Sequence, residues 1–152
     1  MNKVILSSVL IIVLIGVFLL FNKPATAMAY DGKVTVYKSM SCGCCSAYAS
    51  WLQKLKLDVE IVDMNDIASI KEKYNIPVNM RSCHTTFYGD YIVEGHIPIE
   101  AVKKLLDEKP NIRGIAMPGM PSGSPGMPGS KEGQFVIYAL ENDGSTNVFM
   151  RM

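Results

Sequence analysis

The spacing of hydrophobic residues changes several times along the chain, and each period predicts either a helix or a strand. Residues 34–37 alternate in β-branched and aromatic side chains, which is typical of a strand. Across residues 44–57 apolar side chains recur at i, i+3, i+4 and i+7, which predicts an amphipathic helix. Residues 59–62 form a second strand-like stretch, and residues 65–76 carry a capping side chain and an apolar stripe that stops before Pro77. The first half therefore predicts strand, helix, strand and helix.

Turn residues divide the second half in the same way. Residues 83–87 and 91–94 flank a Gly-Asp pair and predict a hairpin. Residues 98–110 begin and end with proline and carry an apolar stripe, which predicts a helix. The order strand, helix, strand, helix, strand, strand, helix predicts an α/β chain with a thioredoxin-like fold, in which helices cover a sheet. Residues 135–140 and 146–150 predict an added C-terminal β-hairpin that packs beside the main sheet or extends it.

A segment rich in methionine, glycine and proline lies between the last helix and this hairpin. Residues 114–133 repeat the sequence Gly-Met-Pro, and this composition predicts no regular structure. The methionines that it offers to a neighbouring site are Met117, Met120 and Met127. We expect the segment to be a soft, mobile cover that lies outside the folded core. The alternative is a flexible linker whose methionines only pack.

The N-terminus has the pattern of a secretory signal. Lys3 is followed by an apolar run over residues 4–21, and two Ala-x-Ala patterns come before residue 30. We therefore expect residues 1–29 to be a signal peptide and residues 30–152 to be one exported domain, periplasmic or otherwise extracytoplasmic. The alternative is an uncleaved membrane anchor, because the run approaches the roughly 17 to 25 residues that cross a bilayer.

Composition limits the classes of partner. The chain has 152 residues, which allows one compact domain beside the N-terminal segment, and a formal net charge of +1. Lysine and arginine form no run dense enough to follow a phosphate backbone, which argues against a nucleic-acid partner. The unusual feature is sulfur, with 4 cysteines and 10 methionines.

Three of the cysteines lie where the first predicted strand gives way to the first helix, in the sequence Cys42-Gly-Cys44-Cys45. The positive end of a helix dipole favours thiolates at such a position. Cys42 and Cys45 alone suffice for thiol–disulfide exchange, whereas Cys44 adds a third soft ligand that can bridge Cu(I) ions. In the thioredoxin arrangement the start of the third strand packs against this helix, so Cys83 is expected to join them.

The two histidines are weaker candidates. Consecutive residues of a strand point to opposite faces, so a Cys83 that faces the cluster turns His84 away unless the strand begins or bulges there. His96 is a candidate by residue type only. A zinc site of three cysteines and His84 would leave Cys44 unused and lacks the two well-spaced ligand pairs of structural zinc. Two structural disulfides are a further alternative, although the adjacent Cys44 and Cys45 diverge on a helix turn.

Four ordered motifs extend this interpretation. They are CGCC after a strand, Ser-Cys-His-Thr at 82–85, Val-Glu-Gly-His-Ile-Pro at 93–98 and the Met-Pro-Gly repeats at 116–127. Over residues 34–127 the chain resembles the CopG-type periplasmic copper-resistance family, which is catalogued as a domain of unknown function. The resemblance implies a thioredoxin-like protein that binds several copper ions through its CXCC motif and a further cysteine, and that cycles copper between oxidation states. The cysteine positions of the family are matched by Cys42, Cys44, Cys45 and Cys83, and other recurrent positions by His84, His96, Met117 and Met120.

The resulting hypothesis is a copper-binding protein of copper resistance or homeostasis, in which the cysteines hold one or more Cu(I) ions in a sulfur-bridged site. Copper ions and other exported copper-handling proteins are the expected partners, and the membrane is one only if the N-terminal segment is not cleaved. The main alternative is a thioredoxin-like thiol–disulfide oxidoreductase that uses Cys42 and Cys45 without metal. A binding protein is favoured over a copper or thiol oxidoreductase, so no catalytic residue is assigned.

Overall fold

The computed structural model describes residue 12 and residues 30–152, and the predicted signal segment falls almost wholly outside these residues. The described part forms a seven-stranded mixed sheet with three α-helices and one short 3₁₀ helix. In chain order the elements are β1 (Lys33–Ser39), α2 (Gly43–Lys54), β2 (Asp58–Met64), α3 (Ile67–Lys73), η1 (Val78–Met80), β3 (His84–Tyr88), β4 (Tyr91–Glu94), α4 (Ile99–Glu108), β5 (Gly114–Ala116), β6 (Val136–Leu140) and β7 (Thr146–Arg151). None of the described helices is long and apolar enough to cross a membrane.

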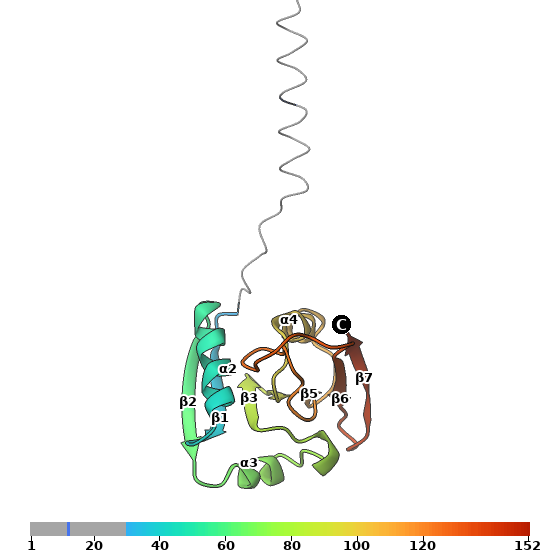
Figure 1. Cartoon of the computed structure of the whole chain (residues 1–152). Coiled ribbons are helices and arrows are strands. Elements are labelled where there is room, and N and C mark those ends of the chain that lie inside the picture. The colour runs from blue at the N-terminus through green and yellow to red at the C-terminus, as the bar shows by residue number, and fades with distance from the viewer. Residues whose placement is uncertain (1–11, 13–29) are drawn as a thin grey trace, which may run out of the picture.

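The strands lie in the order β2-β1-β3-β4-β5-β6-β7 (Figure 1). Two neighbouring pairs are parallel, β1 with β2 and β4 with β5, and the other pairs are antiparallel. Parallel neighbours need a crossover connection, which α2 and α4 provide, whereas short turns join β3 to β4 and β6 to β7. The predicted α/β architecture is confirmed, and the C-terminal hairpin extends the main sheet.

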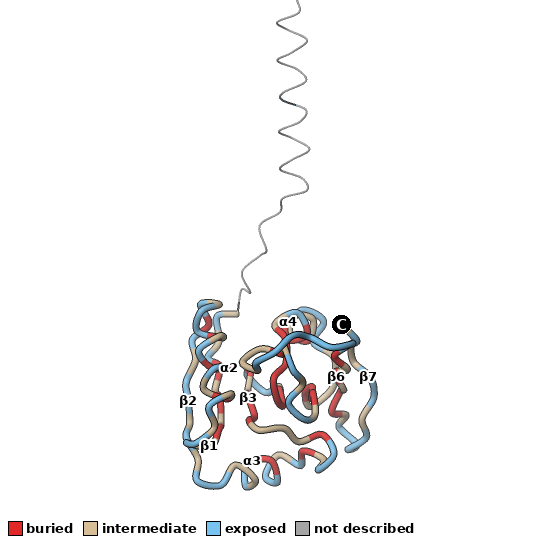
Figure 2. The backbone as a smooth tube through the Cα atoms, viewed as in Figure 1, coloured by how far each residue is buried: buried red, intermediate tan, exposed pale blue. Residues whose placement is uncertain are grey.

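An apolar layer packs against each face of the sheet, and Figure 2 marks the buried residues along the backbone in red. In the larger layer, Tyr48 and Leu52 of α2 and Leu105 of α4 pack with Val34 and Val36 of β1. The smaller layer contains Ile76, Met80, Ile92, Ala116 and Leu140. Neighbouring strand residues fall into different layers because side chains alternate across a strand. The helix that carries the cysteine cluster, α2, therefore lies on the face with the larger core.

The segment predicted to be irregular, residues 114–133, begins with a strand, so this part of the prediction is wrong. Gly114–Ala116 form β5, which pairs with both β4 and β6. A side chain at position 114 would collide with the backbone of Ile92, so glycine allows the close approach of β5 to β4. Ile115 and Ala116 are fully buried, and their burial stabilises this short strand. β5 thereby connects the C-terminal hairpin to the rest of the sheet.

Candidate metal centre

The N-terminus of α2 carries three of the four cysteines. Immediately before it, Ser39 ends β1 and its carbonyl oxygen accepts a hydrogen bond from Cys42 N at 3.0 Å. Cys42 is the N-cap of α2, and its sulfur accepts a hydrogen bond from the backbone N–H of Cys45 at 3.3 Å. Sulfur here takes the role that a serine or aspartate oxygen commonly has at the start of a helix. The cap holds the Cys42 sulfur at the positive end of the helix dipole.

The four cysteine sulfurs lie within 4.8 Å of one another. Cys42 and Cys45 are joined by a disulfide, whereas Cys44 and Cys83 are free. Cys44 Sγ lies 3.5 Å from Cys42 Sγ and 3.9 Å from Cys83 Sγ. Residues 30–152 thus contain one disulfide, and not the two of the structural-disulfide alternative. Reduction of this bridge by two electrons and two protons gives four thiols in one place.

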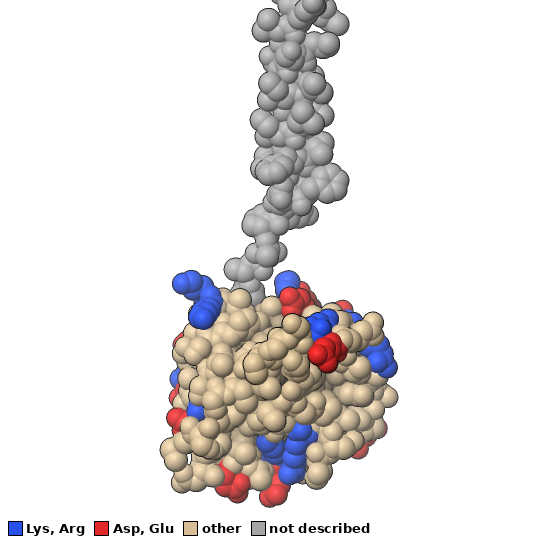
Figure 3. Space-filling model, in the orientation of Figure 1, with Lys and Arg blue, Asp and Glu red and all other residues tan. Residues whose placement is uncertain are grey.

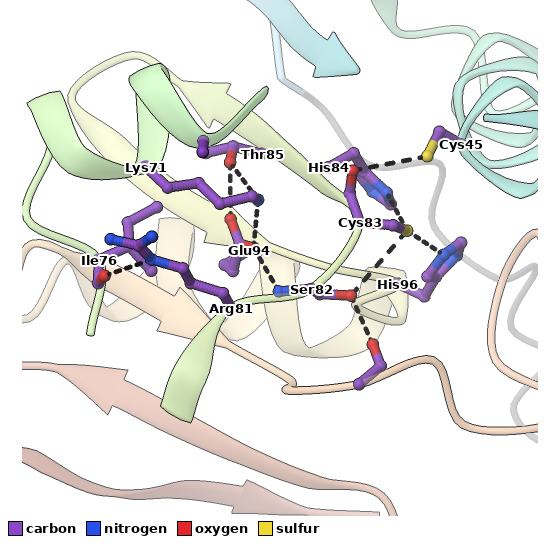
Figure 4. A network of polar contacts seen from close by, with 12 residues as sticks. Cys45, Lys71, Ile76, Arg81, Ser82, Cys83, His84, Thr85, Glu94 and His96 are labelled. Carbon is purple, nitrogen blue, oxygen red and sulfur yellow. Dashed lines mark hydrogen bonds and ion pairs between the residues drawn. The ribbon is translucent and has the colours of Figure 1, made fainter. Parts of the chain in front are cut away.

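Cys83 also belongs to a second group, with His84 and His96, whose ligand atoms lie within the same 4.8 Å. Cys83 Sγ is 3.4 Å from His84 Nδ1 and 3.0 Å from His96 Nε2, and Figure 4 shows both imidazoles beside the sulfur. Because β3 begins at His84, Cys83 precedes the strand and strand alternation does not separate the two side chains. The exception that the sequence left open, a strand that begins at this point, is therefore the case found here, and His84 lies beside Cys83.

The surroundings of the two imidazoles suit metal ligands. His96 Nδ1 lies 2.7 Å from the carbonyl oxygen of Pro125, which can only accept, so Nδ1 carries the proton and donates it. Nε2 then presents its lone pair on the side of Cys83, the arrangement that outer-shell carbonyls give to metal-bound histidines. His84 lies against Tyr48, with ring centroids 4.5 Å apart, and its Nε2 is buried without a hydrogen-bond partner among the described residues. A metal ion or a water molecule would satisfy this nitrogen.

Burial also sets the protonation of the site. It is the main cause that lowers the pKa of His84 and that of His96, so both imidazoles are neutral at pH 7. Burial, and next the neighbouring Cys44, raises the pKa of the Cys83 thiol to about 12. Cys83 does not belong to α2, so it lacks the position at the helix N-terminus at which the helix dipole favours the thiolates of the other cysteines. A bound metal ion has to displace the proton of this thiol.

Known proteins are similar to this chain in sequence and in fold. A family model described as "Protein of unknown function, DUF411" matches residues 80–127, which include Cys83 and both histidines. Two solved structures of a copper resistance protein CopG, Form 2 and Form 1, are each 31% identical to this chain, with TM-scores of 0.73 and 0.72. The likeness covers 79% of this chain and 97% and 96% of those chains. The chain belongs to the CopG copper-resistance family. No match was found among curated proteins.

In this CopG-family chain the backbone of the methionine loop, residues 117–133, contacts His96, the residue before Cys83 and the first turn of α2. Ser82 Oγ donates a hydrogen bond to the Gly119 carbonyl oxygen, and the Pro125 carbonyl oxygen accepts one from His96 Nδ1. Gly126 lies so close to α2 that an added Cβ would be 2.8 Å from the Cys44 carbonyl oxygen. The loop appears in orange across the front of the sheet in Figure 1, and the middle of this face is mainly uncharged in Figure 3. The loop therefore covers the cluster with neutral groups.

The three methionines of this loop have different environments. Met117 directly follows β5, is 1% exposed and packs in the larger core. The prediction that the loop lies outside the folded core is therefore wrong at Met117. Met120 is 51% exposed, and Met127 is half-buried. Met117 is drawn inward because the buried residues of β5 lead directly into it.

Sequence reasoning missed several residues that surround the CopG-family site. Tyr48 lies against both imidazoles, and its hydroxyl donates to the Ile97 carbonyl oxygen at 3.0 Å. The available signal was its position three residues after Cys45, on the same buried face of α2. Lys71 and Glu94 form a buried ion pair behind Cys83. The sequence signal for that pair was weak, because Glu94 is the last residue of an apolar strand and a charged residue at a strand end is usually expected to be exposed.

Proposed function

We propose that this protein binds Cu(I) in copper resistance or homeostasis, with cysteine sulfurs as the core ligands. The observation that carries the proposal is the meeting of two ligand groups at Cys83, four sulfurs in one group and one sulfur with two imidazoles in the other. Thiolate and imidazole are ligands that suit copper. Membership of the copper-resistance family supports copper over other soft metals.

The proposed ligands fall into three sets. The sulfur set becomes complete once the disulfide is reduced, and it consists of Cys42, Cys44, Cys45 and Cys83. The nitrogen set is His84 and His96, and the proposed thioether set is Met117 and Met120. Because Cys83 belongs to both the first and the second set, its thiolate can bridge ions, and we propose more than one copper per chain.

Thiol–disulfide exchange is a second candidate function, and the Cys42–Cys45 disulfide at the start of α2 favours it. We propose that the elements from β1 to α4 form a thioredoxin-like unit, in which such a pair follows a strand and opens a helix. In that function Cys42 attacks and Cys45 resolves. Oxidation of the Cys42 and Cys45 thiols to the disulfide would release two electrons and two protons, and the electrons would reduce two Cu(II) ions to Cu(I). Such a step would link the two candidate functions.

We further propose that residues 1–29 are a signal peptide and that residues 30–152 are the exported, extracytoplasmic domain. The protein recovered from the periplasm or the medium is expected to begin near Met28 or Tyr30, because the Ala-x-Ala patterns end there. N-terminal sequencing or intact mass measures this directly. Recovery of an uncleaved N-terminus solely in the membrane fraction would show that the segment is an anchor.

Copper affinity is expected to rise with pH. The pKa of Cys83 is raised to about 12 by burial and by Cys44, so its thiol is protonated near neutral pH and Cu(I) must release that proton. Each released proton increases the apparent affinity about tenfold per pH unit. Competition against a Cu(I) chelator in anaerobic buffer, between about pH 6 and about pH 8, measures how steeply the apparent affinity rises with pH. In Cys83→Ser, the number of protons released on copper binding should fall by about one, and the pH dependence should become correspondingly weaker. An affinity of the parent protein that does not change with pH would contradict thiolate ligation.

The proposed thioether ligands can be tested by leucine substitution. Exchange of Met117, Met120 and Met127 for leucine keeps volume and hydrophobicity, so the free energy of unfolding without metal should change by less than about 1.5 kcal/mol. Retention of Cu(I) against a chelator should nevertheless weaken. Met150→Leu on β7 is the matched control and should leave copper retention unchanged. If the triple variant holds copper as tightly as the parent, the loop supplies no ligand.

A further inference from the structure

A buried ion pair lies behind the cysteine cluster and joins α3 to β4. Lys71 Nζ and Glu94 Oε1 are 2.5 Å apart, and their side chains are 4% and 0% exposed. Burying two charges is unfavourable unless further hydrogen bonds satisfy them. Thr85 supplies one such bond, because its hydroxyl donates to Glu94 Oε2 at 2.6 Å and accepts from Lys71 Nζ at 3.1 Å. The pair is therefore part of a closed polar network inside the fold.

The network also includes the backbone of Ser82, which is not needed to neutralise either charge. Glu94 Oε1 also accepts a hydrogen bond from the backbone N–H of Ser82, at 2.6 Å. Ser82 directly precedes Cys83, in a segment that belongs to no helix or strand. Figure 4 shows Glu94 between Lys71 and Ser82, with the Cys83 sulfur beyond them, next to the two imidazoles. The carboxylate thus holds the peptide that leads into Cys83.

The main chain at Glu94 and Gly95 is also hydrogen-bonded to two other proposed ligands, Met117 and His84. The Glu94 carbonyl oxygen accepts from Met117 N at 3.0 Å, and Gly95 N donates to the His84 carbonyl oxygen at 3.1 Å. Gly95 has a φ of +86°, and an added Cβ would lie 2.7 Å from Ser82 Cβ. The two hydrogen bonds are main-chain bonds and do not involve the Glu94 carboxylate, so a change of the Glu94 side chain leaves them in place and acts on the ligands through Ser82.

We propose that Glu94, with Lys71 as its counter-ion, is a positioning residue that holds Cys83 at the metal site. The proposal rests on the proposed copper function. Without the carboxylate, the backbone N–H of Ser82 loses its hydrogen-bond acceptor. The Cys83 sulfur is then no longer held 3.0 Å from His96 Nε2 and 3.9 Å from Cys44 Sγ. Metal ligands depend on such outer-shell partners for their orientation.

Two double variants separate positioning from general stability. Lys71→Met with Glu94→Leu and Lys71→Met with Glu94→Gln both remove the two charges together, so neither leaves an unpaired buried charge. Only glutamine keeps a carbonyl oxygen that can accept from Ser82 N. The leucine variant should bind Cu(I) about 10- to 100-fold more weakly than the parent, whereas the glutamine variant should bind close to the parent. Thermal unfolding without metal shows that each variant is folded.

The same leucine change in a Cys83→Ser chain tests whether Glu94 acts through Cys83. No further loss of affinity is expected there. An equal loss with and without Cys83, or parent-like copper binding by the leucine variant, would overturn the proposal.

A readout without copper keeps this test independent of the proposed function. In a Cys44→Ser chain with the Cys42–Cys45 disulfide intact, Cys83 is the one free thiol, because the chain has 4 cysteines. Its alkylation by iodoacetamide should become several-fold faster in the leucine variant and stay unchanged in the glutamine variant. If the parent bound no copper, the proposed function would fail, and this comparison would still decide the role of Glu94. An alkylation rate that does not differ between the two variants would overturn it.

Discussion

Cys44→Ser is expected to lower the affinity for Cu(I) by more than the roughly 10- to 100-fold that loss of an outer-shell partner causes, or to remove at least one copper ion per chain. Cys44 Sγ lies between the Cys42 sulfur at 3.5 Å and the Cys83 sulfur at 3.9 Å. It is therefore the sulfur that connects the helix pair to the second ligand group. Anaerobic chelator competition and copper content per chain measure the loss.

The same variant separates the two candidate functions. Cys42 and Cys45 remain paired in Cys44→Ser, so the equilibrium of this disulfide with glutathione should change little. Ser46→Ala, on the same turn of α2, is the matched control and should retain copper. Full copper binding by Cys44→Ser would defeat the cluster and favour a plain dithiol.

Cys83→Ser is expected to have the largest effect on copper, because Cys83 is the residue that the two ligand groups share. Its sulfur is within 3.4 Å of a nitrogen of each imidazole, so its loss separates His84 and His96 from the remaining thiols. We expect copper bound near the imidazoles to be lost, and only copper held by Cys42, Cys44 and Cys45 to remain. X-ray absorption at the copper edge should then report fewer sulfur neighbours and no nitrogen neighbours.

A matched control lies beside this residue. Ser82→Ala removes a hydroxyl near the Cys83 sulfur but keeps the backbone N–H that donates a hydrogen bond to Glu94. It should keep nitrogen among the copper neighbours. Nitrogen neighbours that persist in Cys83→Ser would show that the imidazoles bind copper without Cys83, and the shared-sulfur geometry would then be wrong.

Local patterns in the sequence predict most of the elements but not how they meet. The alternation at Val34 and Val36 and the helical spacing of Tyr48 and Leu52 place β1 and α2 correctly, because burial on one face dictates such periods. β5 has three residues and depends on pairing with strands far away in the chain, so its own sequence carries little signal.

The candidate site shows the same division between local and long-range information. The CXCC sequence and the expected position of Cys83 come from local motifs and from element order. The approach of His84 to Cys83 depends on the residue at which β3 begins, and strand boundaries are the least certain part of sequence interpretation. The buried Lys71–Glu94 pair joins residues on α3 and β4, and charged residues are usually placed at the surface when only a sequence is known.

Anaerobic titration of the reduced protein with Cu(I), followed by native mass spectrometry, tests the central claim most directly. We expect more than one copper ion to be retained per chain, and a smaller number in Cys44→Ser measured side by side. A reduced parent protein that retains no copper, while its Cys42–Cys45 pair exchanges disulfides with a thiol substrate, would contradict the account.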